Sequence, residues 1–358
     1  MIKDERKNKK KVLIFLPGGV GGAERMSVLI GKLLPKERYH VKFVILGKLQ
    51  AISNVIPKDY DVDCIPVRNI YAFSTLRIWW KIMREKPDLI FASQVAYNSR
   101  VIIAAKLAGR PVIIRSSGMV GKYPIFKYLG VRFTYPKANA IIAQQEDMRK
   151  EIMHLLKIHP NKVVTIHNPL DYDDLDNLSS EPFPYKADDS INYVESASIC
   201  NRKAQDVAIR AFAIVKRRIP KAELYFVGHC EEKNSYCQSL NTLIANLNLQ
   251  ESVHFIGFDK NPFRWVKNAN CFVFPSRSEG LPNALIEASY LGVPCAATRC
   301  LRIVEDIIKD GENGYVVDVD DVEGMANAMM KAINIKQCKM VYKPGTADDF
   351  IHIFENIH

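Results

Sequence analysis

The sequence predicts an α/β protein made of two doubly wound domains, each with a parallel sheet between layers of helices. Its 358 residues exceed the usual length of one hydrophobic core. Short segments rich in Val and Ile alternate with amphipathic segments of helix length, a pattern typical of strand–helix–strand units. A polar stretch with three prolines interrupts this alternation once, and the alternation then starts again.

The first half contains six short apolar runs, and their continuous apolar character indicates strands buried on both faces. They cover residues 11–16, 40–46, 87–93, 111–116, 139–144 and 162–167. Segments 23–34, 75–85 and 98–107 lie between them and have the pattern of helices. We therefore predict a first domain over residues 1–170.

The stretch 167–190 is acidic, contains the three prolines and has little apolar content, so we predict the domain linker there. Strand-like runs then resume at 191–198, 222–228, 252–257, 270–276, 293–298 and 314–319, with helix-like segments at 204–216 and 283–291. A second domain of the same class is predicted over 171–344. A helical tail, 345–358, follows it.

About half of the residues are apolar and a quarter are charged, which is the balance of a soluble globular protein. No run of about 18 residues is free of charge and apolar. The basic residues 1–11 lead into a strand-like run without the apolar core of a signal peptide. We therefore expect a cytoplasmic protein whose eight cysteines, none in Cys-x-x-Cys spacing, are reduced core residues.

The charge is uneven along the chain. Residues 1–170 hold 30 Lys and Arg against 12 Asp and Glu, whereas residues 171–358 hold 20 against 27. A basic domain attracts nucleic acid, an acidic lipid surface or a phosphorylated substrate. Because no helix-turn-helix, zinc-finger or RNA-binding aromatic motif is present, we do not expect nucleic acid as a partner.

Four glycines, Gly18, Gly19, Gly21 and Gly22, separate the first strand from the first helix. Their exposed backbone N–H groups could approach a phosphate at the helix N-terminus. The spacing fails the dinucleotide fingerprint because Glu24 occupies the position of its third glycine, so NAD binding is disfavoured. A flexible turn without a ligand is the simpler alternative.

The most specific segment is FPSRSEGLPNALIEASYLGVP, in which Glu279 and Glu287 are separated by seven residues. Gly280 opens the helix that carries the second glutamate. Backbone N–H groups at that helix start can receive a diphosphate, and the carboxylates can accept hydrogen bonds from sugar and ribose hydroxyls. This arrangement suits a nucleotide sugar.

The segment resembles the Glu-x7-Glu signature of glycosyltransferase family 4, and GGAER resembles that family's N-terminal loop. Further similarities follow in order: KAQD at 203–206, LYFVG at 224–228, VHFIG at 253–257 and EDIIKDGENGYVV at 305–317. The resemblance implies a GT-B fold, with two Rossmann-like domains facing across a cleft, and retaining transfer. It also implies that the tail 345–358 returns to the first domain.

By this resemblance, Glu287 would hold the ribose, and Glu279 would face the donor sugar. Glu279 and Lys203 would form the catalytic pair, Lys203 neutralising the departing diphosphate. The donor-binding set would comprise Gly21, Gly22, Arg202, Lys203, Gly228, Glu279, Gly280, Leu281, Pro282, Asn283 and Glu287. Taken alone, Glu279, Glu287 or Lys203 would more often be a solvated surface residue, but their occurrence together in the family's order favours a donor site.

The chain departs from the family pattern in its donor domain. The usual Gly-Arg-Leu ahead of Lys203 is replaced by Ala-Ser-Ile, with Ser198 at the position of the phosphate-binding arginine. Arg202 is the candidate for a second positive charge. The Gly-Gly pair before Glu305 is replaced by Leu301 and Arg302, so sugar contacts there cannot be transferred.

On the acceptor side, relatives often carry a histidine in the loop that here reads PVIIRSSGMVG, residues 111–121. Arg115 and Ser117 are the acceptor-side candidates in its place. The family's favoured front-face substitution lets the departing phosphate assist deprotonation of the acceptor, so no histidine is required. We expect neither a cofactor nor a metal, because the acidic runs 171–174 and 318–321 resemble an Asp-x-Asp metal site only weakly.

Two segments, 76–86 and 123–137, interleave Trp, Tyr and Phe with Lys and Arg, which suits an anionic membrane surface. Alternatively, Trp79, Trp80, Phe126 and Phe133 face the core and the basic residues are merely solvated. With the basic excess, we expect a peripheral protein at the inner face of the plasma membrane.

The expected activity is retaining transfer of a hexosyl or N-acetylhexosaminyl unit from a UDP-linked sugar to a polyprenyl-linked glycan, in surface polysaccharide or glycoconjugate assembly. One alternative is a catalytically weakened protein of the same fold that acts as a partner or regulatory subunit, because the arginine is missing at Ser198. Another is a GT-B-like epimerase or phosphorylase.

Overall fold

The computed structural model describes residues 9–19, 21–48, 52, 55–66, 74–183, 189–230 and 235–357. The chain forms two compact units. Unit 1 comprises Met1–Pro169 and Pro344–His358, and unit 2 comprises Leu170–Lys343. The predicted boundaries, after 170 and 344, lie one residue from these.

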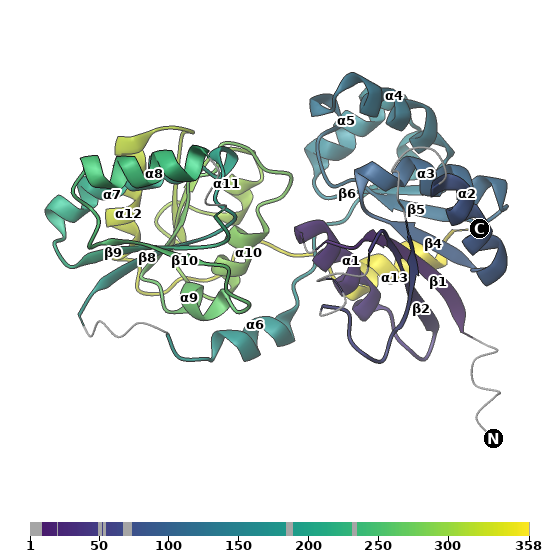
Figure 1. The fold of residues 1–358 in the computed structure, drawn as a ribbon, viewed down its shortest axis with the longest axis horizontal. Coiled ribbons are helices and arrows are strands. Elements are labelled where there is room, and N and C mark those ends of the chain that lie inside the picture. The colour runs from purple at the N-terminus through teal and green to yellow at the C-terminus, as the bar shows by residue number, and fades with distance from the viewer. Residues whose placement is uncertain are drawn as a thin grey trace. The chain divides into compact units, whose positions relative to one another are not determined.

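Unit 1 is built on a seven-stranded parallel sheet with the strand order β3-β2-β1-β4-β5-β6-β7 (Figure 1). Its strands are β1 (Lys10–Pro17), β2 (Tyr39–Leu46), β3 (Asp61–Ile65), β4 (Leu89–Ala92), β5 (Val112–Arg115), β6 (Ala140–Ala143) and β7 (Val163–Thr165). The central strands are buried on both faces, as their unbroken apolar sequences predict.

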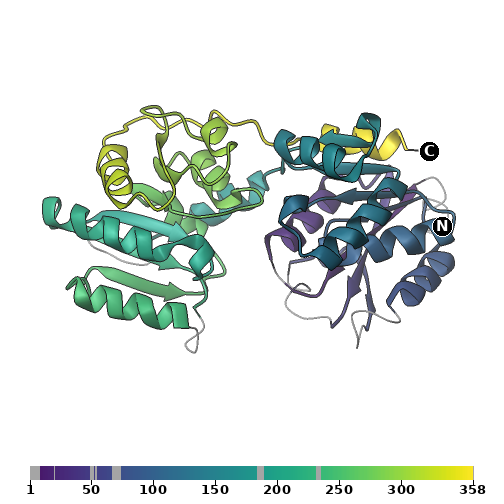
Figure 2. The same cartoon turned by 90° about the horizontal axis from the view of Figure 1, so that it is seen from above.

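The helices of unit 1 cover both faces of this sheet and create two apolar cores. They are α1 (Gly22–Leu33), α2 (Ser74–Glu85), α3 (Val95–Leu107), α4 (Ile125–Thr134), α5 (Glu146–Leu156) and α13 (Ala347–Glu355). Helix α13 begins with a capping box between Thr346 and Asp349 and contacts α1. Its Phe350 and Phe354 are fully buried in the core of unit 1, and Figure 2 shows this C-terminal helix within unit 1.

Unit 2 contains a six-stranded parallel sheet with the order β10-β9-β8-β11-β12-β13. Its strands are β8 (Ile191–Ser196), β9 (Ala222–Val227), β10 (Val253–Gly257), β11 (Cys271–Phe274), β12 (Cys295–Thr298) and β13 (Gly314–Val317). Its helices are α6 (Tyr172–Ser179), α7 (Gln205–Arg218), α8 (Ser235–Asn246), α9 (Phe263–Lys267), α10 (Asn283–Tyr290), α11 (Val304–Ile307) and α12 (Val322–Ala332). Cores on both faces complete the doubly wound fold.

The structure differs from the prediction at two elements. Strand β3 was missed because its short sequence DVDCI alternates aspartates with apolar residues and forms no continuous apolar run, which an exposed edge strand permits. Helix α6 lies in the predicted linker: Leu175 is buried against unit 2, and the Asn261 amide donates to the Leu178 carbonyl oxygen. Helix α6 of the acidic segment therefore folds as part of unit 2, because a few apolar side chains suffice to dock one short helix.

The expectation that all cysteines are reduced is also wrong. Cys230 and Cys237 form a disulfide whose Cα atoms lie 6.3 Å apart. It links the loop after β9 to the first turn of α8, a proximity that sequence spacing alone does not reveal. Of the other six, Cys271 and Cys295 are buried and Cys64 is exposed.

Candidate donor site

The sheet of unit 2 reverses its strand order between β8 and β11, which lie side by side at its centre. At such a point, the loops leaving two neighbouring strands diverge to opposite faces and leave room for a ligand. The loop after β8 carries Arg202 and Lys203 on a single 3-10 turn, Asn201–Lys203, and the loop after β11 carries Glu279. The predicted catalytic pair therefore lies at this switch point.

Glu279 is held by two cations. The Lys203 ammonium lies 2.6 Å from its Oε1, and the Arg202 guanidinium donates to its Oε2 at 2.8 Å. The Ser276 hydroxyl donates to Oε1 at 2.9 Å. The side chains of Glu279 and Lys203 are largely buried, whereas that of Arg202 is half exposed. The single Glu279 carboxylate thus neutralises only one of the two positive charges of Lys203 and Arg202, so this poorly solvated cluster has a net positive charge.

Arg277 joins the two loops. Its guanidinium donates to both carboxylate oxygens of Asp206, at 3.0 and 2.7 Å, and to the Asn201 carbonyl oxygen at 2.8 Å. Its backbone N–H donates to the Arg202 carbonyl oxygen at 2.9 Å. Burial alone would raise the pKa of Asp206, but bonds from Arg277 and the Tyr236 hydroxyl hold it below its usual value.

These supporting residues were not predicted. Asp206 and Arg277 lie inside the two motifs that the sequence singled out, KAQD and FPSRSEG, so the motifs carried a signal for them. Cys300, after β12, has no such signal. Burial and the nearby Glu279 carboxylate raise the pKa of its thiol to about 11, so it is an uncharged neighbour of the pair.

The other predicted donor residues of unit 2 lie on two loops. Residues 280–282 lie in the loop before α10, with Leu281 and Pro282 buried, so the helix begins at Asn283 and not at Gly280 as predicted. Glu287 is half-buried one turn into the helix. Gly228 directly follows β9, and a Cβ there would lie 1.8 Å from the Ala197 carbonyl oxygen. Glycine is therefore required for the close approach of β9 to the loop after β8.

Gly21 and Gly22 lie at the equivalent switch point of unit 1, between β1 and β4. Gly21 N–H donates to Glu24 Oε2 at 3.1 Å, and the Gln94 amide donates to Glu24 Oε1 at 2.8 Å. Glu24 is itself buried and thus fixes the glycine loop to the residues after β4. A donor contact by Gly21 and Gly22 stays a prediction.

The two acceptor-side candidates have different environments. The Arg115 side chain is only 1% exposed, and its Nη2 donates to Asn168 Oδ1. Burial lowers the pKa of Arg115 to about 9. Its guanidinium is enclosed by protein atoms, so Arg115 does not present its charge at the surface. Ser117 is half-buried and is the more accessible candidate.

The two weak metal-site resemblances have local roles. Asp171 caps α6 by accepting from Asp174 N–H, and Asp321 caps α12 by accepting from Gly324 N–H at 2.8 Å.

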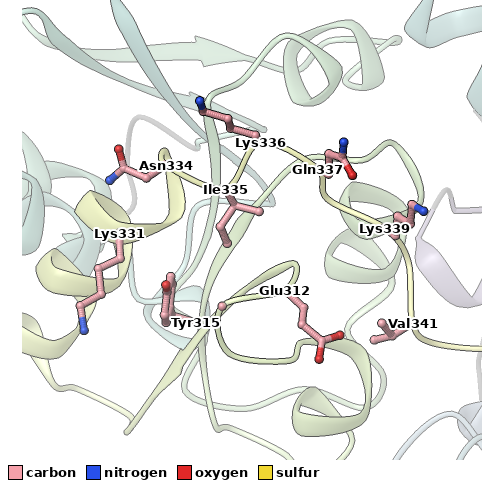
Figure 3. A pocket seen from close by; sticks show the side chains of 10 residues that line it. Glu312, Tyr315, Lys331, Asn334, Ile335, Lys336, Gln337, Lys339 and Val341 are labelled. Atoms are coloured by element: carbon pink, nitrogen blue, oxygen red, sulfur yellow. The ribbon is translucent and has the colours of Figure 1, made fainter.

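A pocket of about 580 Å³ lies elsewhere in unit 2, near Tyr315 and Lys331 (Figure 3). None of the predicted site residues lines it.

Two family models match successive parts of the chain. The model described as "Glycosyltransferase Family 4" matches residues 20–174, and the model described as "Glycosyl transferases group 1" matches residues 182–346. The chain belongs to the group 1/family 4 glycosyltransferases. The Glu-x7-Glu segment and Lys203 of this family 4 protein lie within the second match.

Similar proteins agree with this assignment. The family 4 chain is 32% identical over 62% of its length to an uncharacterized glycosyltransferase of Methanocaldococcus jannaschii, of which 58% is covered. It is 25% identical over 60% of its length to N-acetylgalactosamine-N,N'-diacetylbacillosaminyl-diphospho-undecaprenol 4-alpha-N-acetylgalactosaminyltransferase of Campylobacter jejuni, of which 56% is covered. The chain therefore spans less than two thirds of each of these relatives.

Anabaena HepE, solved in complex with UDP and glucose, has a similar structure with a TM-score of 0.79. The two chains are 17% identical over 96% of this chain and 98% of HepE. At this identity the similarity concerns the fold alone, and it confirms the expected GT-B fold of two Rossmann-like domains.

Proposed function

We propose that this protein is a retaining glycosyltransferase that moves a hexosyl or N-acetylhexosaminyl unit from a UDP-linked sugar to a polyprenyl-linked glycan, in surface polysaccharide or glycoconjugate assembly. The observation that carries the proposal is the Lys203–Glu279–Arg202 cluster at the switch point of unit 2. Lys203 and Arg202, which both pair with the Glu279 carboxylate here, can instead bind the negatively charged diphosphate of a donor. The UDP in HepE and the lipid-linked acceptor in the name of the Campylobacter relative support these choices.

In this mechanism the donor diphosphate takes over Lys203 and Arg202, which frees the Glu279 carboxylate to accept hydroxyl hydrogens of the donor sugar. As the bond from the anomeric carbon to the phosphate oxygen breaks, negative charge grows on the diphosphate, and the two fixed cations stabilise it. The departing phosphate oxygen receives the proton of the acceptor hydroxyl, which attacks from the same face. This sequence uses no metal ion and retains the anomeric configuration.

Arg202 bears directly on the catalytically weakened alternative. That alternative rests on Ser198, which stands where the family has its phosphate-binding arginine. Arg202 reaches the same carboxylate as Lys203, so a second cation is present at the cluster from another position of the loop. Its half-exposed side chain is able to turn toward a ligand, whose diphosphate would then replace the Glu279 carboxylate as its partner. We therefore favour an active enzyme.

In this proposal, unit 1 binds the acceptor and contacts the membrane surface. Large apolar side chains are exposed on three successive helices, α2, α3 and α4, which contact one another in sequence. These side chains are Leu76, Trp80, Met83, Ile103, Leu107, Ile125, Phe126, Leu129 and Phe133. Trp79 instead packs against the core, so the core-facing alternative holds only for that tryptophan.

Basic side chains accompany this apolar surface. The Arg84 guanidinium lies 5.5 Å from the Trp80 ring centroid, and the Lys127 ammonium lies 4.6 Å from that of Tyr123. Apolar rings that penetrate the interface, flanked by cations that meet anionic headgroups, favour peripheral binding. None of the helices in the described ranges is both long and apolar enough to cross a membrane. We propose peripheral association with the inner face of the plasma membrane.

The test is thermal stabilisation of the purified chain by UDP, GDP, their sugar conjugates and NAD, measured beside Glu287→Ala. A ligand that binds the folded state raises the melting temperature. We expect a shift selective for UDP and UDP-sugars that Glu287→Ala abolishes, followed by α-linked product from a polyprenyl-diphosphate glycan. No shift with any nucleotide would reject the donor site in favour of the non-catalytic alternative.

A further inference from the structure

Glu195 is a buried carboxyl group that the mechanism above does not use. It is the penultimate residue of β8 and is only 3% exposed. Its Oε1 accepts a hydrogen bond from the Gln205 amide at 2.7 Å. Within the described part of the chain, its Oε2 has no hydrogen-bond partner. Burying a polar atom without a hydrogen-bond partner costs stability, so a role in the protein would explain why a carboxyl group occupies this buried position.

Gln205 connects Glu195 to the loop that carries the donor-site cations. Its side chain is fully buried, its Oε1 accepts from Cys200 N–H at 3.3 Å, and its amide also lies 3.4 Å from the Ser198 carbonyl oxygen. The Lys203 N–H in turn donates to the Cys200 carbonyl oxygen at 2.8 Å. The Glu195 carboxyl thus anchors the backbone of the loop through one side chain.

Gln205 contacts the segment in which this chain departs from the family sequence. The loop residues bound by Gln205 include Ser198, which stands at the position of the missing arginine. Gly228, directly after β9, allows the close approach of the chain to Ala197 and Ser198 of the same loop. The main chain of the loop is therefore held by hydrogen bonds to the Gln205 side chain, and the cations of the loop, Arg202 and Lys203, lie at its end.

The charged and titratable groups around Glu195 come from each neighbouring element. Lys203 follows β8, Asp206 opens α7, Tyr236 begins α8, and Glu279 follows β11. Burial raises the pKa of Glu195 well above its usual value, and Lys203 opposes this only in part. An uncharged Glu195 leaves the positive excess of the Lys203–Glu279–Arg202 cluster intact, whereas a second carboxylate would cancel it.

We propose that Glu195 is a positioning residue of the donor site, which as an uncharged acid fixes the 198–203 loop through Gln205 and keeps the Lys203 charge available for the donor diphosphate. This inference rests on the proposed function. It predicts a specific hierarchy among variants. Glutamine at position 195 preserves both the acceptor for the Gln205 amide and the neutral charge, whereas alanine removes the anchor.

The experiment measures UDP affinity by calorimetry for the native chain, Glu195→Gln, Glu195→Ala and Gln205→Ala. Loss of one buried hydrogen bond at the anchor predicts about tenfold weaker UDP binding for Glu195→Ala and Gln205→Ala. Glu195→Gln should stay within about twofold of the native affinity. Glu223→Ala is the matched control, because Glu223 is a β9 glutamate of the same unit that pairs with Lys216 and His254, outside the loop.

A pH series separates positioning from a purely structural role. As pH rises, the native Glu195 ionises, so the affinity of the native chain should fall relative to that of Glu195→Gln, which cannot ionise. Equal affinities of all four proteins, or parallel pH profiles of native and Glu195→Gln, would overturn the inference while leaving the donor site intact. A native chain that binds no UDP would overturn both proposals. If Glu195→Ala does not fold, Gln205→Ala and the pH series decide.

Discussion

The Lys203 ammonium lies 2.6 Å from Glu279 Oε1, although 75 residues lie between Lys203 and Glu279 in the chain. The contact exists because β8 and β11 are adjacent in the sheet and their following loops leave the same edge. In the proposed mechanism Lys203 stabilises the departing diphosphate, but in this structure it is paired with Glu279, the carboxylate proposed to contact the donor sugar. On donor binding, the diphosphate would therefore replace the Glu279 carboxylate as the partner of Lys203.

The first prediction concerns Lys203 itself. Lys203→Ala should lower kcat by about 10²- to 10³-fold, because it removes a fixed charge directed at the departing diphosphate. Initial rates with UDP-sugar and acceptor would measure this loss. Lys221→Ala is the control, since Lys221 is an exposed lysine of the same unit that pairs with Asp189. A Lys203→Ala enzyme with native kcat would remove Lys203 from the mechanism.

The second prediction tests whether Arg202 replaces the missing family arginine. Arg202→Ala should raise the KM for the donor by about tenfold, because a charge-assisted bond to the diphosphate is lost. Introducing Ser198→Arg into that variant should restore part of the affinity, since it returns a cation to the family position. Arg217→Ala, at an exposed site in the last turn of α7, serves as the control. Unchanged donor KM in Arg202→Ala would contradict the replacement.

The third prediction concerns stability of unit 1. Burial alone would raise the pKa of Glu85, but hydrogen bonds from Lys11, Lys81 and Lys42 hold it far below its usual value. A depressed pKa stabilises the fold above the ordinary carboxyl pKa, and this contribution is lost as pH falls through the folded-state value. Glu85→Gln should therefore cost about 2 kcal/mol of unfolding free energy at neutral pH.

Urea unfolding of native and Glu85→Gln chains across an acidic pH series would measure this difference. The gap between the two should narrow as the pH decreases, because the native Glu85 becomes protonated. Glu37→Gln, an exposed substitution in the same unit, should leave stability unchanged at every pH. A gap that is independent of pH would assign the loss to packing instead of charge.

The fourth prediction concerns the membrane surface of unit 1. Trp80→Ala combined with Phe126→Ala should weaken binding to anionic vesicles by more than about tenfold, because each ring contributes roughly 1.5–3 kcal/mol when it leaves water. Vesicle sedimentation would measure binding, and the double variant should bind UDP normally. Phe258→Ala is the control, since Phe258 is also an exposed aromatic residue but belongs to unit 2. Native vesicle binding by the double variant would reject this surface.

Most of the fold and the central residues of the site could be predicted from local patterns. Unbroken apolar runs gave twelve of the strands, since a strand buried on both faces requires them. The Glu-x7-Glu segment and Lys203 were identified because their motif is contiguous or ordered along the chain. Strand β3 and helix α6 were missed, because their few apolar side chains carry too little signal.

The sequence by itself determined the two doubly wound sheets and the family, and it predicted Lys203, Arg202, Glu279 and Glu287 as donor-site residues, because these depend on periodicity and on residues at fixed spacing. Only the tertiary structure decided that Arg202 shares Glu279 with Lys203, that Trp80 is exposed while Trp79 is packed, and that Glu195 anchors the donor loop through Gln205. Burial and long-range pairing arise when distant strands become neighbours, and no local pattern encodes them.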